Sequence, residues 1–157
     1  MSKPNLSVLI VDDEPRIRHL MSRILISLGY SVRCAEDGYT ALARIKEACP
    51  DVLLSDLNMP GMSGFELLSE VRQRFPGIYV IATSGSFSGT LVPQGVVADV
   101  FYEKATSLSL LLQHMERGAR WKQEPSRSSG MPTPWWIAPT RIEACETEEF
   151  AVSLQAI

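Results

Sequence analysis

The chain has 157 residues, a formal net charge of -3, 45% hydrophobic residues and 21% charged residues. Its length suits one ordinary domain with an appendage and is too short for two comfortable domains. No apolar run is long enough to span a bilayer, which argues against a membrane protein. Lys and Arg do not cluster, and direct nucleic-acid binding is disfavoured because it draws its energy from clustered basic side chains.

Two features bear on the cellular compartment. Residues 1–6 lack the basic stretch and apolar core of a secretory signal. The cysteines, at positions 34, 49 and 145, are widely spaced and form no CxxC pair, which suggests neither a disulfide framework nor a zinc site. We therefore expect the protein in the reducing cytoplasm.

The chain opens with a predicted strand and a predicted helix. Residues 6–11 are a short apolar run rich in β-branched side chains, typical of a buried strand, and the run ends in Asp12 and Asp13. Pro15 begins a helix that Gly29 closes. Its apolar positions follow the spacing of one helix face: Ile17, Leu20, Met21, Ile24, Leu25 and Leu28.

The same pattern then repeats. A second strand, over 30–35, precedes a helix that Asp37 can cap. A third buried strand ends at Asp56 and leads into a loop rich in Pro and Gly. Ser63 and Glu66 match a capping box, and so predict the start of the next helix.

The last third of the predicted domain is less regular. A fourth strand, over 78–82, ends near Ser84, and a fifth, over 100–102, ends at Lys104. A final helix is predicted from about residue 106 to residue 120. Between the last two strands, Gly and Pro residues interrupt any long helix, so the helix expected there is short or irregular.

Residues 122–157 differ in composition from the rest. They are rich in Pro and Ser, carry the pair Trp135-Trp136 and become acidic. We read residues 1–121 as the domain and 122–157 as a linker and tail. The two tryptophans could dock a partner or fold back on the domain.

Alternating strands and helices predict a parallel sheet with helices on both faces, because each crossover must return over the sheet. In such α/β folds, ligands bind outside the carboxyl ends of the strands. The polar residues expected at that edge are Asp12, Asp13, Asp56, Ser84 and Lys104.

These residue types predict phosphoryl chemistry. Carboxylates brought together repel one another, and a hard divalent cation such as Mg²⁺ relieves that repulsion. With Asp13 and Asp56 as ligands, Mg²⁺ keeps open positions for a phosphoryl oxygen. A carboxylate can itself act as a nucleophile and become an acyl phosphate. The Lys104 ammonium and the Ser84 hydroxyl would then stabilise the transferring group.

Four motifs, in this order, resemble the receiver domain of two-component response regulators. They are Val11-Asp12-Asp13-Glu14, Ser55-Asp56-Leu57-Asn58-Met59-Pro60-Gly61-Met62-Ser63-Gly64, Thr83-Ser84-Gly85 and Glu103-Lys104. The resemblance covers residues 5 to about 120. It implies a flavodoxin-like, doubly wound, five-stranded parallel sheet in the strand order 2-1-3-4-5.

The resemblance also implies a function. Asp56 would accept phosphate from a histidine kinase or a histidine phosphotransfer protein, and the domain would be a switch rather than an enzyme. Asp12 and Asp13 would position Mg²⁺, with the Asn58 backbone carbonyl completing its shell. Ser84 would be the switch hydroxyl and Phe101 the aromatic switch.

Output would then be by protein contact. In the family, the face made by the fourth helix, fifth strand and fifth helix changes partners on phosphorylation. The expected partners of this chain are therefore a downstream protein and a second copy that pairs through that face, with no nucleic acid and no membrane.

Two departures from the family pattern stand out. Ala105 follows the lysine where the family usually has proline, often with a cis bond. A non-proline cis bond costs about 2.5–4 kcal/mol, so we expect this peptide to be trans. The interrupted fourth helix lies on the face that normally signals.

Other interpretations remain open. Asp13 can cap a helix as well as bind metal, and Phe101 can be simple core. His19 and His114 are expected to be exposed. A degenerate receiver could act as a scaffold without phosphorylation. An aspartyl-phosphate hydrolase of the haloacid dehalogenase type would need an Asp-x-Asp pair, which neither acidic motif contains.

Overall fold

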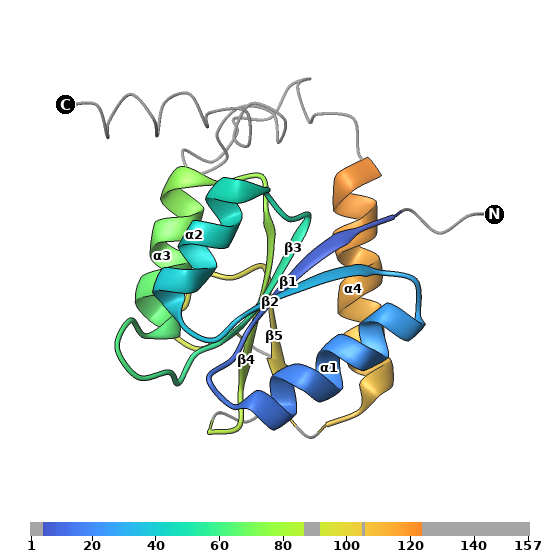
Figure 1. The fold of residues 1–157 in the computed structure, drawn as a ribbon, viewed down its shortest axis with the longest axis horizontal. Helices are drawn as coiled ribbons and strands as arrows, with labels where there is room; N and C mark the ends of the chain where they lie inside the picture. The colour runs from blue at the N-terminus through green and yellow to red at the C-terminus, as the bar shows by residue number, and fades with distance from the viewer. Residues whose placement is uncertain (1–4, 87–91, 105, 124–157) are drawn as a thin grey trace.

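The computed structural model describes residues 5–86, 92–104 and 106–123. Strands and helices alternate along most of these ranges, as predicted (Figure 1). The elements are β1 (Ser7–Val11), α1 (Pro15–Ser27), β2 (Ser31–Ala35), α2 (Gly38–Glu47), β3 (Val52–Asp56), α3 (Gly64–Arg74), β4 (Tyr79–Ser84), β5 (Val100–Glu103) and α4 (Leu108–Gln123).

The five strands form one parallel sheet in the order β2-β1-β3-β4-β5. Strands covered on both faces are nearly continuous apolar runs, and the central strands β1 and β3 have this character. The order reverses between β1 and β3, where the chain crosses back over β1. The predicted flavodoxin-like topology is therefore confirmed.

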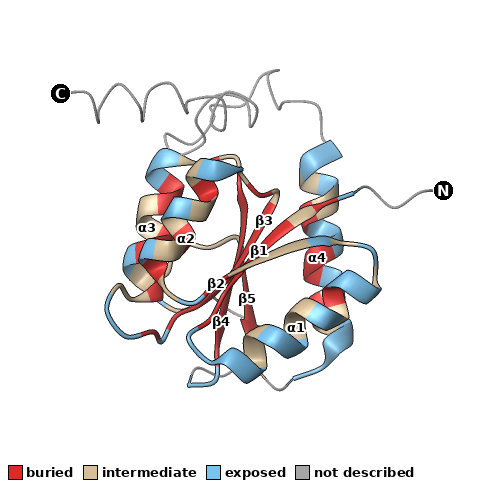
Figure 2. Ribbon diagram, viewed as in Figure 1, coloured by how far each residue is buried: buried red, intermediate tan, exposed pale blue. Residues whose placement is uncertain are grey.

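Side chains of β1 enter two separate cores, because successive residues of a strand face opposite sides of the sheet. Leu9 and Val11 lie in the core beneath α2 and α3, whereas Val8 and Ile10 lie in the core beneath α1 and α4. Figure 2 shows buried strands between helices whose outer surfaces are exposed. Helices thus cover both faces, as expected.

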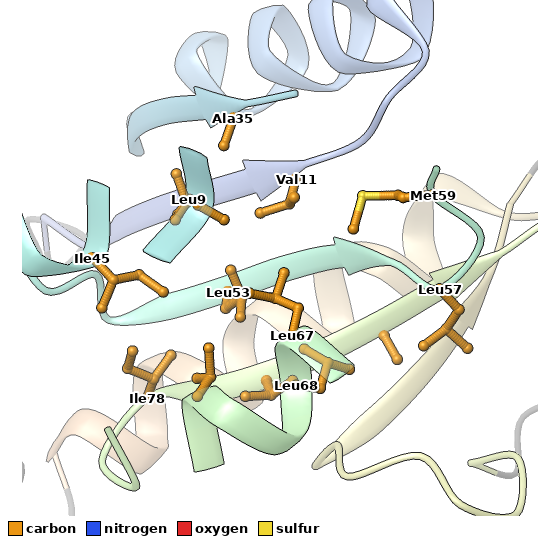
Figure 3. Close-up of a cluster of buried hydrophobic side chains, with 14 of the residues drawn as sticks. Leu9, Val11, Ala35, Ile45, Leu53, Leu57, Met59, Leu67, Leu68 and Ile78 are labelled. Atoms are coloured by element: carbon orange, nitrogen blue, oxygen red, sulfur yellow. The ribbon is translucent and has the colours of Figure 1, made fainter. Parts of the chain in front are cut away.

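The core beneath α2 and α3 is drawn in Figure 3. It joins residues of the sheet to apolar stripes of the two helices. The helical residues in it are Ala41, Ile45, Leu67, Leu68 and Val71. Each is no more than 1% exposed, so these side chains fix how α2 and α3 lie on the sheet.

Helix starts follow the predicted caps with one exception. The Asp37 carboxylate accepts a backbone N–H of the first turn of α2, and Ser63 and Glu66 form a reciprocal capping box on α3. The N-cap of α1 is Glu14, which makes no side-chain cap hydrogen bond. Asp13 therefore does not cap α1, and the proline at the first helical position organises that turn instead.

Two burial predictions on helices are wrong. Leu20, expected on the inward stripe of α1, is 55% exposed, because α1 covers the sheet near its edge strand and buries only Leu25. His114, expected in solvent, is 6% exposed. It lies beside Met115 on the face of α4 that packs on the sheet. His19 is exposed, as expected.

Residues 92–99, which lead into β5, contain no helix. The rest of the predicted fourth helix, residues 87–91, lies outside the described residues. The segment is anchored at Asp99, whose carboxylate accepts hydrogen bonds from Arg72 Nη2 at 2.9 Å and from the Val80 backbone N–H at 2.7 Å. The ion pair, the strand backbone and the packing of Val96 and Ala98 against the core beneath α2 and α3 therefore hold the entry to β5.

The last helix continues to Gln123, past the boundary expected at residue 121. Its final turn packs on the domain, since the Trp121 ring lies 6.1 Å from the Tyr79 ring and Lys122 Nζ lies 2.9 Å from Asp51 Oδ2. The predicted linker and tail, residues 124–157, lie outside the described residues. Within the described part, no helix combines the length and apolarity needed to cross a membrane.

The cysteines differ from expectation. Cys34 is a free thiol, whereas Cys49 is disulfide-bonded. The expectation of no disulfide is therefore wrong for Cys49, because spacing along the sequence does not determine which segments meet in the fold.

Candidate functional site

The carboxyl ends of four strands meet at one edge of the sheet. Asp56 is the last residue of β3 and Ser84 the last of β4, while Asp12 and Lys104 directly follow β1 and β5. Neighbouring parallel strands end side by side, so these four residues gather although the sequence separates them widely.

Lys104 bridges two buried carboxylates. Its Nζ lies 2.8 Å from Asp12 Oδ2 and 2.9 Å from Asp56 Oδ2. Both aspartate side chains are 5% exposed, and the lysine side chain is 22% exposed. The two carboxylates and the ammonium group therefore lie together, as expected. They are largely shielded from water, so the electrostatic interactions between them are strong.

Asp13 adds a third carboxylate. One oxygen from each of Asp12, Asp13 and Asp56 lies within 4.8 Å of the others, and Asp13 is the exposed member. One ammonium cannot neutralise three carboxylates, so the cluster carries excess negative charge that opens to solvent on the Asp13 side. Oxygen donors of this kind suit Mg²⁺, which keeps several waters and takes one or two carboxylates. These residues could hold such an ion.

The protonation of Asp56 and Lys104 reflects this environment. Burial raises the pKa of Asp56, and hydrogen bonds from Lys104 and from the Asn58 backbone only partly offset it. Burial lowers the pKa of Lys104, but its hydrogen bonds and ion pairs with Asp12 and Asp56 outweigh burial and raise it overall. Lys104 therefore stays protonated, whereas burial disfavours the charged form of the Asp56 carboxylate beside it.

The backbone after Asp56 is closely packed. The Asn58 N–H donates to Asp56 Oδ1 at 3.1 Å, and the Gly64 N–H donates to the Leu57 carbonyl at 3.0 Å. A Cβ on Gly64 would lie 2.2 Å from the Asp56 carbonyl oxygen. Gly64 was expected only as a loop residue. The lack of a side chain at this position allows the start of α3 to pack directly against the backbone of Asp56.

Ser84 lies in the same edge and is fully buried. Its Oγ accepts hydrogen bonds from Asn58 Nδ2 at 2.9 Å and from the Ser86 backbone N–H at 3.0 Å. The role expected for Asn58 at the cation site was that of its backbone carbonyl. The link from its side chain to Ser84 depends on two loops meeting, which residue spacing does not reveal.

The loop after β1 is held by a residue that the sequence did not single out. Arg18 Nη1 donates to the Asp12 carbonyl at 2.6 Å, and the Glu14 N–H donates to Asp12 Oδ1 at 2.9 Å. Asp12 thus uses one carboxylate oxygen for its own loop and the other for Lys104. An arginine one turn into a helix is common, so no sequence signal marked Arg18.

Phe101 and Ala105 complete the predicted set. The Phe101 ring is 1% exposed and packs in the core beneath α2 and α3, together with Leu57 and Ala82. This position suits a core residue, and the switch role stays a prediction. Ala105 and its peptide bond with Lys104 lie outside the described residues.

Comparison with known proteins agrees with this geometry. The family model of the response regulator receiver domain matches residues 8–114. The transcriptional regulator NtrC of Salmonella typhimurium is 43% identical over 74 residues, which are 47% of this chain and 16% of NtrC. The chain therefore corresponds to a minor part of that longer protein.

Solved structures show the same fold. The chemotaxis protein CheY4 of Vibrio cholerae is 33% identical, with a TM-score of 0.64 over 71% of this chain and 97% of CheY4. TrrA of Thermotoga maritima, crystallised with Mg²⁺ and BeF, is 29% identical, with a TM-score of 0.67 over 72% of this chain and 98% of TrrA. TrrA has also been solved in complex with the histidine kinase ThkA.

Proposed function

Because this chain belongs to the response regulator receiver domain family, we propose that it is a signalling switch whose phosphoryl acceptor is Asp56. The donor would be the phosphohistidine of a histidine kinase or a phosphotransfer protein. The observation that carries the proposal is the ion-paired cluster at the sheet edge, where Lys104 Nζ lies within 2.9 Å of both Asp12 and Asp56. Three carboxylates within 4.8 Å support a cation there.

The positions of these groups support an in-line phosphoryl transfer. A carboxylate oxygen of Asp56 attacks phosphorus in line with the phosphohistidine nitrogen, the P–N bond breaks, and the imidazole leaves with that electron pair. Bound Mg²⁺, held by Asp12, Asp13, Asp56 and the Asn58 carbonyl, would neutralise charge on the phosphoryl oxygens.

Two side chains would stabilise the same charge. Lys104 exchanges part of its contact with Asp56 for a phosphoryl oxygen, and the Ser84 hydroxyl donates to another. Phosphate on Asp56 would thereby contact Ser84 at the end of β4 and Lys104 after β5 at the same time. Phe101, in β5, would follow this change and alter the face formed by the segment before β5, β5 and α4.

The partners follow from the same proposal. TrrA binds the histidine kinase ThkA, and a comparable kinase or phosphotransfer protein would charge Asp56 here. A downstream protein, or a second copy of this chain, would read the face that contains β5 and α4. The domain would assist its own phosphorylation and dephosphorylation, and the cytoplasm stays the predicted compartment.

The test uses Mg²⁺ and a small phosphodonor such as acetyl phosphate. Wild type should form one acid-labile phosphate per chain, and Asp56→Ala should form none. Asp51→Asn is the control, because Asp51 lies at the opposite edge of the sheet and pairs with Lys122. An unphosphorylated wild type that also fails to bind beryllofluoride would overturn the proposal.

A second candidate is a scaffold that does not depend on phosphorylation. The absence of helix from residues 92–99, on the face that would signal, favours it. In that case Asp56→Ala would bind the downstream partner as wild type does, with or without phosphodonor. Steady hydrolysis of many phosphoesters would instead indicate an aspartyl-phosphate hydrolase.

A further inference from the structure

The hydroxyl of Ser84 is held by two donors. Asn58 Nδ2 lies 2.9 Å from Ser84 Oγ, and the Ser86 backbone nitrogen lies 3.0 Å from it. Ser84 is fully buried, so bulk water does not compete for this oxygen. The hydroxyl therefore has a defined orientation before any phosphate is present.

A serine hydroxyl offers one O–H donor and two acceptor lone pairs. Here the two hydrogen bonds occupy both lone pairs, so the hydroxyl can act further only as a donor. Phosphoryl oxygens accept hydrogen bonds and cannot donate them. The Ser84 hydroxyl can thus still donate one hydrogen bond, and a donor is what a phosphoryl oxygen requires.

We propose that the side-chain amide of Asn58 is a positioning residue that keeps the Ser84 hydroxyl as a donor for the phosphoryl group on Asp56. This rests on the proposed function. Asn58 also donates its backbone N–H to Asp56 Oδ1 at 3.1 Å. One residue therefore orients both the acceptor carboxylate, through its backbone, and the hydroxyl that stabilises the product, through its side chain.

The position of Asn58 allows a clean test. Asn58 is exposed, whereas its neighbours Leu57 and Met59 are buried. Replacing its side chain leaves the core intact, and the backbone N–H to Asp56 remains. A substitution of Asn58 should therefore change the orientation of the Ser84 hydroxyl without unfolding the loop.

The experiment is a double-mutant cycle read by the affinity for beryllofluoride in saturating Mg²⁺. Asn58→Ala should weaken beryllofluoride binding about 5- to 10-fold, which corresponds to the loss of one orienting hydrogen bond. In the Ser84→Ala background, the same change should alter affinity less than about 2-fold, because coupled residues are not additive. Asn58→Asp should weaken binding at least as much, because a carboxylate would accept the Ser84 hydrogen.

Gln73→Ala is the matched control, since it removes an exposed amide near the far end of α3. Its beryllofluoride affinity should stay within about 2-fold of wild type, below the effect of one hydrogen bond. Unchanged or tighter beryllofluoride binding by Asn58→Ala would overturn the inference, as would an equal loss in the Ser84→Ala background. A wild type that binds no beryllofluoride would overturn the proposed function itself.

Discussion

Both edges of the sheet join a lysine to an aspartate at the same distance. At the carboxyl edge, Lys104 Nζ lies 2.9 Å from Asp56 Oδ2, and at the amino edge Lys122 Nζ lies 2.9 Å from Asp51 Oδ2. The surroundings of the two pairs differ. Asp51 also accepts hydrogen bonds from the Ser7 backbone N–H at 2.9 Å and from its hydroxyl at 3.1 Å.

The comparison shows that an ion pair does not by itself mark a functional site. At the amino edge several donors converge on one carboxylate, so its charge is compensated and the contact ties α4 to β3. At the carboxyl edge Lys104 serves two buried carboxylates, with Asp13 close by. The excess of carboxylates there leaves a negative charge that a bound cation would neutralise.

The largest effect on stability is expected at the amino edge. Arg72 is 8% exposed and pairs at 2.9 Å with Asp99, whose side chain is 15% exposed, so Arg72→Ala leaves a half-buried carboxylate without its cation. We expect a loss of about 3–5 kcal/mol in the free energy of unfolding, measured by urea denaturation. Arg74→Ala, which removes an exposed pair with Glu70, should cost less than about 1 kcal/mol. Equal losses in the two variants would show that the Arg72 pair is not buried in solution.

The second largest effect is the gain in stability from Mg²⁺, which should depend on the carboxyl edge and not on the amino edge. Mg²⁺ at about 100 times its Kd should stabilise wild type by about 2.7 kcal/mol, because it binds only the folded chain. Asp13→Asn should lose most of this gain, whereas Asp51→Asn should keep it. The measurement is thermal unfolding with and without Mg²⁺, and equal gains in all three proteins would place the ion elsewhere.

The same experiment tests the charge excess directly. Burial raises the pKa of Asp56, so its charged form destabilises the folded protein. Without Mg²⁺, Asp56→Asn should therefore melt at a higher temperature than wild type, and added Mg²⁺ should reduce or reverse the difference. A lower melting temperature for Asp56→Asn without Mg²⁺ would contradict the charge excess.

The smallest effect concerns His114, which belongs to neither edge. Burial, and then the nearby Arg117 charge, lower its pKa from 6.5, while the Phe101 backbone partly offsets them. Above pH 6.5 the ring is neutral in both states, so its contribution is fully present. As the pH falls from 6.5 toward the lowered pKa, the unfolded chain binds more protons and stability is lost.

We therefore expect wild type to lose up to about 1 kcal/mol more stability than His114→Leu between pH 7.5 and pH 5.5. The measurement is the free energy of unfolding in urea at each pH. His19→Gln is the control, because His19 is exposed, and it should follow wild type. If His114→Leu showed the same pH dependence as wild type, the ring would not be buried in solution.

Much of the site could be predicted because its chemistry lies at strand ends. Asp12, Asp56 and Lys104 each lie at the carboxyl end of a predicted strand, and parallel strands must bring such ends together. The alternation of strands and helices and the capping box are confirmed for the same reason, since period and cap chemistry are local properties. The strand order, in contrast, was predicted from the resemblance to receiver domains.

What could not be predicted depends on how elements pack. The exposure of Leu20 and the burial of His114 follow from where α1 and α4 lie on the sheet, although both residues fit regular helix patterns. The link from Arg18 to Asp12 requires a helix to fold back over the preceding loop. Local periodicity contains no information on such contacts.

The amino-acid sequence by itself thus determined the parallel α/β fold and the acidic edge that contains Asp56, because strand period and strand-end chemistry are local. Only the tertiary structure decided how the charges at that edge are shared. The bond from Asn58 to Ser84 and the bridge of Lys104 between Asp12 and Asp56 join separate loops. Their geometry is set by how the strands pair and not by any one segment.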